Sequence, residues 1–184
     1  MAVSWRNVGR MWHRRDVHVP ALSLLATAAS ALALTVTSAG ASRPPSKWLT
    51  WNAHARTASL VLVAGYDGSN NGFNFDGYGR GKLLVRVPVG WRVTVTCRNA
   101  ASMRHSCAIV RGAQTITPAF RGAATRVPTL GLDSGEVARF RFTASRAGTY
   151  RIACLVPGHE QARMWDVFDV GGVRHPSISA RTGF

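Results

Sequence analysis

Acidic side chains are scarce in this chain of 184 residues, which has 8 Asp and Glu against 23 Lys and Arg and a formal net charge of +15. The excess persists after residue 41, where 19 basic residues face 7 acidic ones. The basic residues stand singly between apolar ones, as Arg92 and Arg98 do in "WRVTVTCRN". This spacing indicates the solvent-exposed face of a sheet. It does not favour a nucleic-acid-binding surface, in which basic residues cluster along one stripe. Few carboxylates also leave few groups whose protonation unfolds a protein, so we expect tolerance of acid.

Helical periodicity is also missing after residue 41, where short alternating runs are separated by turn residues. In "WRVTVTCRN" one face carries Val93, Val95 and Cys97, as a strand with one buried face requires. The chain is long enough for one well-buried domain. We therefore expect an all-β sandwich or barrel with antiparallel pairing. The predicted strands lie within 58–65, 82–90, 91–99, 106–112, 136–144, 148–154 and 164–170.

The N-terminal region differs from the rest, because four arginines precede the uncharged, Ala- and Leu-rich stretch 19–41. Its 23 residues could span a hydrocarbon core of about 30 Å, and "AGA" at 39–41 suits a signal peptidase. We expect residues 1–41 to be a signal peptide or a membrane anchor, either of which places the domain outside the cytoplasm. Two prolines in 42–47 predict a linker, and 48–170 is the expected domain.

Three other segments lack strand patterns. Residues 65–81 are rich in Gly and Asn and predict a long turn, whereas 111–135 is the longest stretch without alternation. Loops of that length in compact domains tend to cover something functional. The C-terminal segment 171–184 has no apolar period and is expected to be a flexible tail.

Cysteine, histidine and methionine meet in "ACLVPGHEQARMW", where Cys154, His159 and Met164 are spaced by five. A thiolate, imidazoles and a thioether form a soft ligand set that suits copper in a trigonal site with a weak axial methionine. One loop can bring three such ligands to one ion, with Pro157-Gly158 bending the chain before His159. A fourth ligand should come from elsewhere, since a single loop would not hold the site rigid.

His105 is the candidate for that fourth ligand, because it follows one predicted strand and begins the next, 49 residues before Cys154. His54 and His175 lie in polar segments and are expected to be solvated. Structural zinc would require more Cys or His and no Met. A copper storage or delivery protein would favour exposed Met and His clusters, for which Met103 and Met164 are few. A copper oxidase or nitrite reductase would need a second copper with its own histidines, and a metal-free adhesion sandwich is the remaining alternative.

The run "GTYRIACLVPGHEQARMWDVFDV" resembles the ligand loop of the cupredoxins, or type 1 blue copper proteins, and most closely that of the sulfocyanins, with rusticyanin-like proteins second. The similarity extends to the segment "AGYDGSNNGFNFDGYGRGKLLVRVPVGW", to "SMRHSCAIV" and to "PAFRGAAT". It covers about 48–170. The resemblance implies a single antiparallel Greek-key β-sandwich and one copper ion with the ligands His105, Cys154, His159 and Met164.

The resemblance also implies residues around the copper. Ser106 and Asn99 would support the ligands, and Ser106 stands where many cupredoxins have Asn, which predicts a high reduction potential. Arg104 replaces a proline usual in relatives, so a more flexible approach to His105 is expected. An apolar docking patch of Leu155, Val156 and Pro157 would surround His159 at the surface.

Two cysteines remain once Cys154 is assigned to copper. Cys97 and Cys107 both point inward by strand alternation, and an even pair in an exported protein allows a disulfide. Two free buried thiols are the favoured interpretation, because the resembled family does not generally use this bridge.

The function that the resemblance implies is electron transfer without catalysis, on the outer side of the membrane in a respiratory chain. The expected partners are redox proteins, namely a terminal oxidase, a cytochrome or an iron- or sulfur-oxidising component, with the membrane reached through the N-terminal anchor and no nucleic acid involved. A copper storage or delivery protein is the alternative function.

Overall fold

The computed structural model describes residues 45–182. The predicted signal peptide or anchor, 1–41, lies outside the described residues, as does the first part of the predicted linker. The end of that linker forms the 3-10 turn η1 (Pro45–Trp48), and a second turn, η2 (Ser69–Gly72), lies in the Gly- and Asn-rich segment. Among residues 45–182, no helix has the length and apolar character that crossing a membrane requires.

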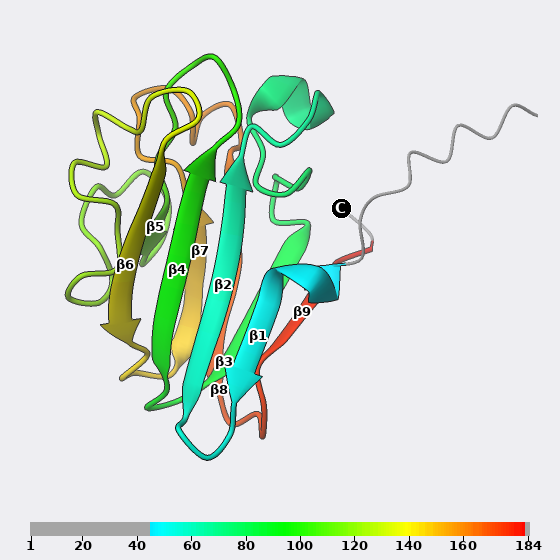
Figure 1. Cartoon of the computed structure of the whole chain (residues 1–184), viewed down its shortest axis with the longest axis vertical. Helices are drawn as coiled ribbons and strands as arrows, with labels where there is room; N and C mark the ends of the chain where they lie inside the picture. Colours follow the sequence, from blue (N-terminus) through cyan, green and yellow to red (C-terminus); the bar gives the residue numbers. More distant parts are fainter. Residues whose placement is uncertain (1–44, 183–184) are drawn as a thin grey trace, which may run out of the picture. The chain divides into compact units, whose positions relative to one another are not determined.

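Within the described residues, nine strands form two stacked sheets (Figure 1). The first sheet has the order β1-β2-β4-β6, and the second has the order β5-β7-β8-β3-β9. The all-β sandwich predicted from the sequence is confirmed. The strands of the first sheet are β1 (Leu49–Asn52), β2 (Thr57–Ala64), β4 (Arg92–Asn99) and β6 (Val137–Thr143); those of the second are β5 (Ala108–Val110), β7 (Gly148–Ala153), β8 (Trp165–Gly171), β3 (Leu83–Pro88) and β9 (Ser177–Ala180).

Strand alternation builds the core between the sheets. On β4 the side chains of Val93, Val95 and Cys97 are buried, while Arg92 and Arg98 are exposed. The facing strand positions add aromatic rings and branched side chains to the same cluster. Burial of these apolar groups is the main favourable term in folding, and the predicted core face of β4 is correct.

The prediction of antiparallel pairing throughout is wrong in two places. Strands β2 and β4 run parallel, as do β3 and β8. The reason is that the chain leaves the first sheet after β2, adds β3 to the second sheet and then returns as β4. Neighbours joined by such crossovers need not be antiparallel, whereas strands joined by a hairpin must be.

The predicted flexible tail is corrected as well, because residues 177–180 form β9, which pairs antiparallel with β3. Ile178 packs against the core, and the other side chains of the strand carry no apolar pattern. An edge strand is held mainly by its backbone hydrogen bonds, so alternation in the sequence does not reveal it. By pairing with β3, β9 covers an edge that would otherwise expose unpaired backbone groups.

The interpretation of Cys97 and Cys107 as free thiols is wrong, since the two form a disulfide with a Cα–Cα distance of 6.0 Å. Cys97 lies on β4 and Cys107 immediately before β5, so the bridge joins the two sheets. Sheets about 10 Å apart are normally too distant for a disulfide. Here the short connection between the strands draws the sheets together locally.

Candidate metal centre

Three side chains with metal-binding atoms converge at one end of the sandwich. The Nδ1 atoms of His105 and His159 are 3.1 Å apart. Cys154 Sγ lies 3.3 Å from the Nδ1 of His159 and 3.9 Å from that of His105. His105 and Cys154 are buried and His159 is partly buried. The structure thus brings together three of the four residues that the sequence predicted as ligands, from segments 49 residues apart.

The loop after β7 positions Cys154 and His159 through a tight turn. The His159 N–H donates to the carbonyl oxygen of Val156 at 3.1 Å, and Gly158 has φ +88°. Proline followed by a residue of positive φ defines a type II turn, which requires Gly at the third position. Pro157-Gly158 therefore turns the imidazole back toward the thiol, as the sequence predicted.

Met164 closes the same loop and is fully buried. Its N–H donates to the His159 carbonyl oxygen at 3.0 Å, and its own carbonyl oxygen accepts from the Cys154 N–H at 3.3 Å. These bonds hold the backbone of Met164 beside both other loop residues.

Burial sets the protonation of the cluster. It lowers the pKa of His105 to about 4, with the neighbouring His159 as a second cause, and it also lowers the pKa of His159. Burial raises the pKa of the Cys154 thiol, which the N–H groups of Ser106 and Val156 partly oppose. The imidazoles are therefore neutral and able to bind a metal, and the thiol loses its proton when a cation binds.

This donor set fits copper. The Nδ1 atoms of His105 and His159 are 3.1 Å apart, so they cannot both be protonated. At least one of them is an unprotonated nitrogen with a lone pair that can bind a metal. Two imidazoles and one thiolate in a buried site match the trigonal ligand set of blue copper centres, and a buried methionine in the same loop matches their weak axial ligand.

Ser106 joins the two ligand segments. Its N–H donates to Cys154 Sγ at 3.2 Å, and its hydroxyl lies 3.7 Å from the same sulfur. The hydroxyl oxygen accepts a bond from the Leu155 N–H at 2.9 Å. Ser106 therefore contacts the sulfur of Cys154 directly and also holds Leu155, the next residue along the ligand loop.

Asn99 contacts none of the predicted ligand side chains and instead binds the backbone near His105. Its amide nitrogen donates to the carbonyl oxygens of Met103 and Leu132, at 2.8 and 3.0 Å. The Leu132 carbonyl oxygen also accepts from the His105 N–H at 3.3 Å. Arg104, where the resemblance suggested a looser approach to His105, forms an ion pair of 2.7 Å with Asp133.

Two residues near the imidazoles were not singled out from the sequence. Phe73 presents its ring edge-on to His159, with centroids 5.0 Å apart, and more distantly to His105. Gly65 has φ +64°, and a Cβ there would lie 2.5 Å from the Cβ of Ala101 and 3.2 Å from His105 Nε2. Only glycine fits this close approach. Both residues lie in the segment "AGYDGSNNGFNFDGYGRGKLLVRVPVGW", which resembles the family, but no local pattern in it indicates these contacts.

A partly buried ion pair also holds the ligand loop and was likewise not predicted. Glu160, next to His159, is 9% exposed and accepts from Arg151 Nη1 at 2.6 Å. Its second oxygen accepts from the Gln114 N–H at 2.6 Å. The Arg151 guanidinium lies 4.1 Å from the ring centroid of Trp165. Both partners are satisfied, so the pair fixes the loop to β7 and to the 111–135 segment.

The predicted docking patch is only partly at the surface, because Leu155 is buried, Val156 half-buried and Pro157 exposed. The long segment 111–135 contributes to the same region, since Ile116 and residues 154–158 line a hollow of about 250 Å³. Ile116 is 66% exposed. This agrees with the expectation that the segment covers a functional region.

The other two histidines of the described part lie apart from the cluster. His54 is exposed in the β1–β2 connection, and His175, also exposed, stacks on Trp51 with ring centroids 4.6 Å apart. Neither belongs to the cluster of three.

Comparison with known proteins gives a match to the sulfocyanin (SoxE) domain over residues 44–176. A curated sulfocyanin from Sulfolobus acidocaldarius is 28% identical over 125 residues, which are 61% of this chain and 62% of that protein. The chain thus spans less than two thirds of that relative's length. A reduced auracyanin from Roseiflexus castenholzii has 24% identity and a TM-score of 0.46, covering 62% of this chain and 97% of its own. A rusticyanin structure has 21% identity and a TM-score of 0.49, covering 62% and 77%.

Proposed function

The chain belongs to the sulfocyanin (SoxE) domain family of blue copper proteins, and on this basis we propose that it carries single electrons through one type 1 copper ion held by His105, Cys154, His159 and Met164. The observation that carries the proposal is the cluster of His105, Cys154 and His159, whose ligand atoms all lie within 4.8 Å of one another. Bound copper supplies a one-electron couple there.

The residues of the chain supply rigidity. Fast electron transfer requires ligands that move little between the two oxidation states, and the contacts around the cluster oppose such movement. Ser106 ties the two ligand segments together, and the Glu160–Arg151 pair holds the turn that bears His159. The disulfide adds a covalent tie between the sheets two residues after His105.

His159 is the proposed outlet for the electron. It is partly buried, whereas the other two members of the cluster are fully buried. The exposed Pro157 lies beside it, and the neighbouring hollow of about 250 Å³ has apolar walls from Val156 and Ile116. A redox partner that covers this apolar surface would approach the imidazole closely and exclude water, with the basic charge of the chain steering an acidic partner.

We assign the protein to the extracytoplasmic side of the membrane, as a carrier that serves a terminal oxidase, a cytochrome or an iron- or sulfur-oxidising component, and without catalytic activity of its own. The support is the family, together with the apolar segment 19–41 of the sequence. A copper storage role is less well supported, because Met164 is buried while Met103 is exposed, so they offer no common Met-rich surface.

The decisive experiment replaces Cys154 by Ser. The copper-loaded protein should show intense visible absorption and one-electron reduction without oxygen consumption, and Cys154→Ser should lose the absorption, because it arises from the thiolate bound to cupric ion. The double variant Cys97→Ala/Cys107→Ala, which keeps Cys154, serves as the control and should remain coloured. An unchanged spectrum in Cys154→Ser would refute the assignment, and steady oxygen consumption would refute a pure carrier role.

A further inference from the structure

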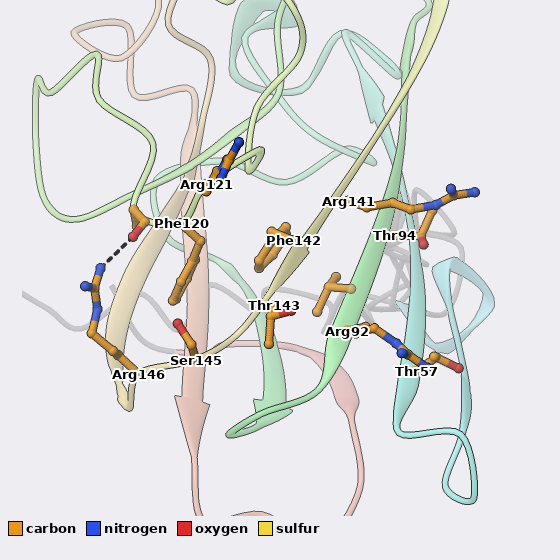
Figure 2. Close-up of a pocket in the computed structure, with 12 residues that line it drawn as sticks. Thr57, Arg92, Thr94, Phe120, Arg121, Arg141, Phe142, Thr143, Ser145 and Arg146 are labelled. Carbon is orange, nitrogen blue, oxygen red and sulfur yellow. Dashed lines mark hydrogen bonds between the residues drawn. The ribbon is translucent and has the colours of Figure 1, made fainter.

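A hollow of about 660 Å³ lies at the beginning of β4 and the end of β6, beside the segment 119–121 (Figure 2). On β4 it is lined by residues 92–94, whereas Asn99, at the other end of the strand, donates a hydrogen bond to the carbonyl oxygen of Met103 in the segment that carries His105. Five residues of strand at about 3.3 Å each separate Thr94 from Asn99 by roughly 16 Å. The hollow is therefore remote from the metal centre, and neither the copper site nor its docking surface explains it.

Four arginines line this hollow: Arg92, Arg121, Arg141 and Arg146. In Figure 2, Arg121 and Arg146 lie on the side of Phe120, whereas Arg92 and Arg141 lie on the other side, with Arg141 extending toward Thr94. No carboxylate is among the lining residues, all of which belong to the described part of the chain. Both ion pairs found within residues 45–182 lie elsewhere. Four like charges around one concavity repel each other, so an anion placed between them would be favoured.

Two of the arginines at the edge of the hollow are held in place by contacts within the protein. Arg146 Nη2 donates to the carbonyl oxygen of Ala119 at 2.8 Å, and its guanidinium carbon lies 5.9 Å from the ring centroid of Phe120. Arg92 Nη2 lies 3.4 Å from the carbonyl oxygen of Ala55. A guanidinium has five N–H donors, so each of these arginines keeps donors for a ligand.

Two aromatic rings of the core lie behind the hollow, and hydroxyl groups lie beside them. The rings of Phe120 and Phe142 are stacked, with centroids 5.3 Å apart and planes inclined by 12°. Figure 2 shows both rings between the arginines, with Thr143 and Ser145 close by, and all four residues line the hollow. Each ring is only 5% exposed, so a ligand here would meet mainly the cations and the hydroxyl donors.

We propose that this hollow is a binding site for a small organic anion that carries at least two phosphate, sulfonate or carboxylate groups. Guanidinium groups bind such groups through paired, charge-assisted hydrogen bonds. The volume lies within the roughly 300–1,000 Å³ typical of small-molecule sites. An inorganic ion would meet the arginines of one side only, whereas a ligand with two separated anionic groups could bind arginines on both sides of the hollow.

The test uses naphthalene-1,5-disulfonate and the copper-loaded full chain, with binding measured by titration calorimetry at low ionic strength. We expect saturable binding of one molecule. Arg121→Gln/Arg141→Gln should weaken it at least about tenfold, since two charge-assisted contacts are lost. The matched control is Arg139→Gln, because Arg139 lies two residues from Arg141 on β6 but bonds to Thr96 Oγ1 at 3.3 Å and does not line the hollow.

Arg139→Gln should change the affinity by less than about twofold, while the visible spectrum and the unfolding transition stay the same in all variants. Neutral naphthalenemethanol should not bind, and inorganic sulfate should bind at least about tenfold more weakly than the disulfonate. Equal losses in Arg139→Gln and Arg121→Gln/Arg141→Gln would overturn the proposal in favour of diffuse charge. Absence of saturable binding, or sulfate binding as tight as the disulfonate, would overturn it as well. None of these outcomes depends on the copper assignment.

Discussion

Ser106 makes contacts that an apolar residue could not make. The hydroxyl accepts from the Leu155 N–H and approaches Cys154 Sγ, while the backbone N–H of Ser106 donates to the same sulfur. The side chain has no exposed surface. One small residue thus links the segment that carries His105 to the loop that carries Cys154.

Replacing Ser106 by Ala should lower the free energy of unfolding by about 1–3 kcal/mol, because the buried Leu155 N–H loses its acceptor. Chemical denaturation of the metal-free protein measures this without interference from copper. Ser106→Thr keeps the hydroxyl and should recover part of the loss. A Ser106→Ala variant as stable as the parent would mean that water replaces the hydroxyl.

At the scale of the elements, the connection between β4 and β5 is the critical one. It leaves the first sheet at Asn99, carries His105 and enters the second sheet after Cys107. The Cys97–Cys107 disulfide closes this connection, and the Asn99 side chain donates to the carbonyl oxygen of Met103 within it. A ligand in a short, closed loop between two sheets has little freedom to move.

Removing the disulfide with Cys97→Ala/Cys107→Ala should lower the free energy of unfolding by roughly 2–4 kcal/mol, since the unfolded chain regains the entropy of an open loop. Thermal or denaturant unfolding with and without a thiol reductant provides the measurement. Reductant should lower the stability of the parent and leave the double variant unaffected. Finding two additional alkylated cysteines in the native, unreduced protein would contradict the bridge.

For the molecule as a whole, two of the few carboxyl groups determine how its stability depends on pH. Asp76 and Asp166 are buried in the sandwich, and within residues 45–182 one oxygen of each has no hydrogen-bond partner. Burial raises the pKa of Asp76 to about 8, and burial together with the charge of Asp76 raises the pKa of Asp166 well above its usual value. The folded protein therefore holds these protons more strongly than the unfolded chain.

Stability should accordingly fall as the pH rises from about 6.5 to 8. Below about pH 6.5 the histidines of the unfolded chain take up protons that His105 and His159, whose pKa values burial lowers, do not take up in the native protein, and this opposes the effect of the carboxyl groups. Between about pH 6.5 and pH 8, where Asp76 ionises in the folded state, the unfolded chain binds fewer protons than the native protein. The free energy of unfolding should fall across this range, by an amount on the order of a few kcal/mol.

Denaturation midpoints of the metal-free protein, measured at several pH values between about 6.5 and 8, check this prediction. Asp76→Asn, which cannot ionise, should flatten the dependence, and Asp67→Asn, on the exposed loop, should leave it unchanged. A midpoint that rises with pH in the parent would contradict both the buried neutral acids and the expected tolerance of acid.

Features that depend on local spacing were predictable from the sequence. The core face of β4 follows from alternation, and the loop ligands follow from the regular spacing of Cys154, His159 and Met164 with Pro157-Gly158 between them. Strand pairing across crossovers was not predictable, because parallel neighbours such as β2 and β4 are separated by a strand of the other sheet. Strand β9 was missed because its stability comes from the backbone of β3 and not from its own side chains.

The sequence by itself determined the all-β class and the set of residues able to bind copper, since both rest on residue types at short, regular separations. Only the tertiary structure decided that Cys97 and Cys107 are bonded, that Gly65 must leave room for His105, and that four arginines share one hollow. The physical reason is distance along the chain: contacts between remote segments arise from the packing of two sheets, and no local pattern of side chains encodes which remote segments will meet.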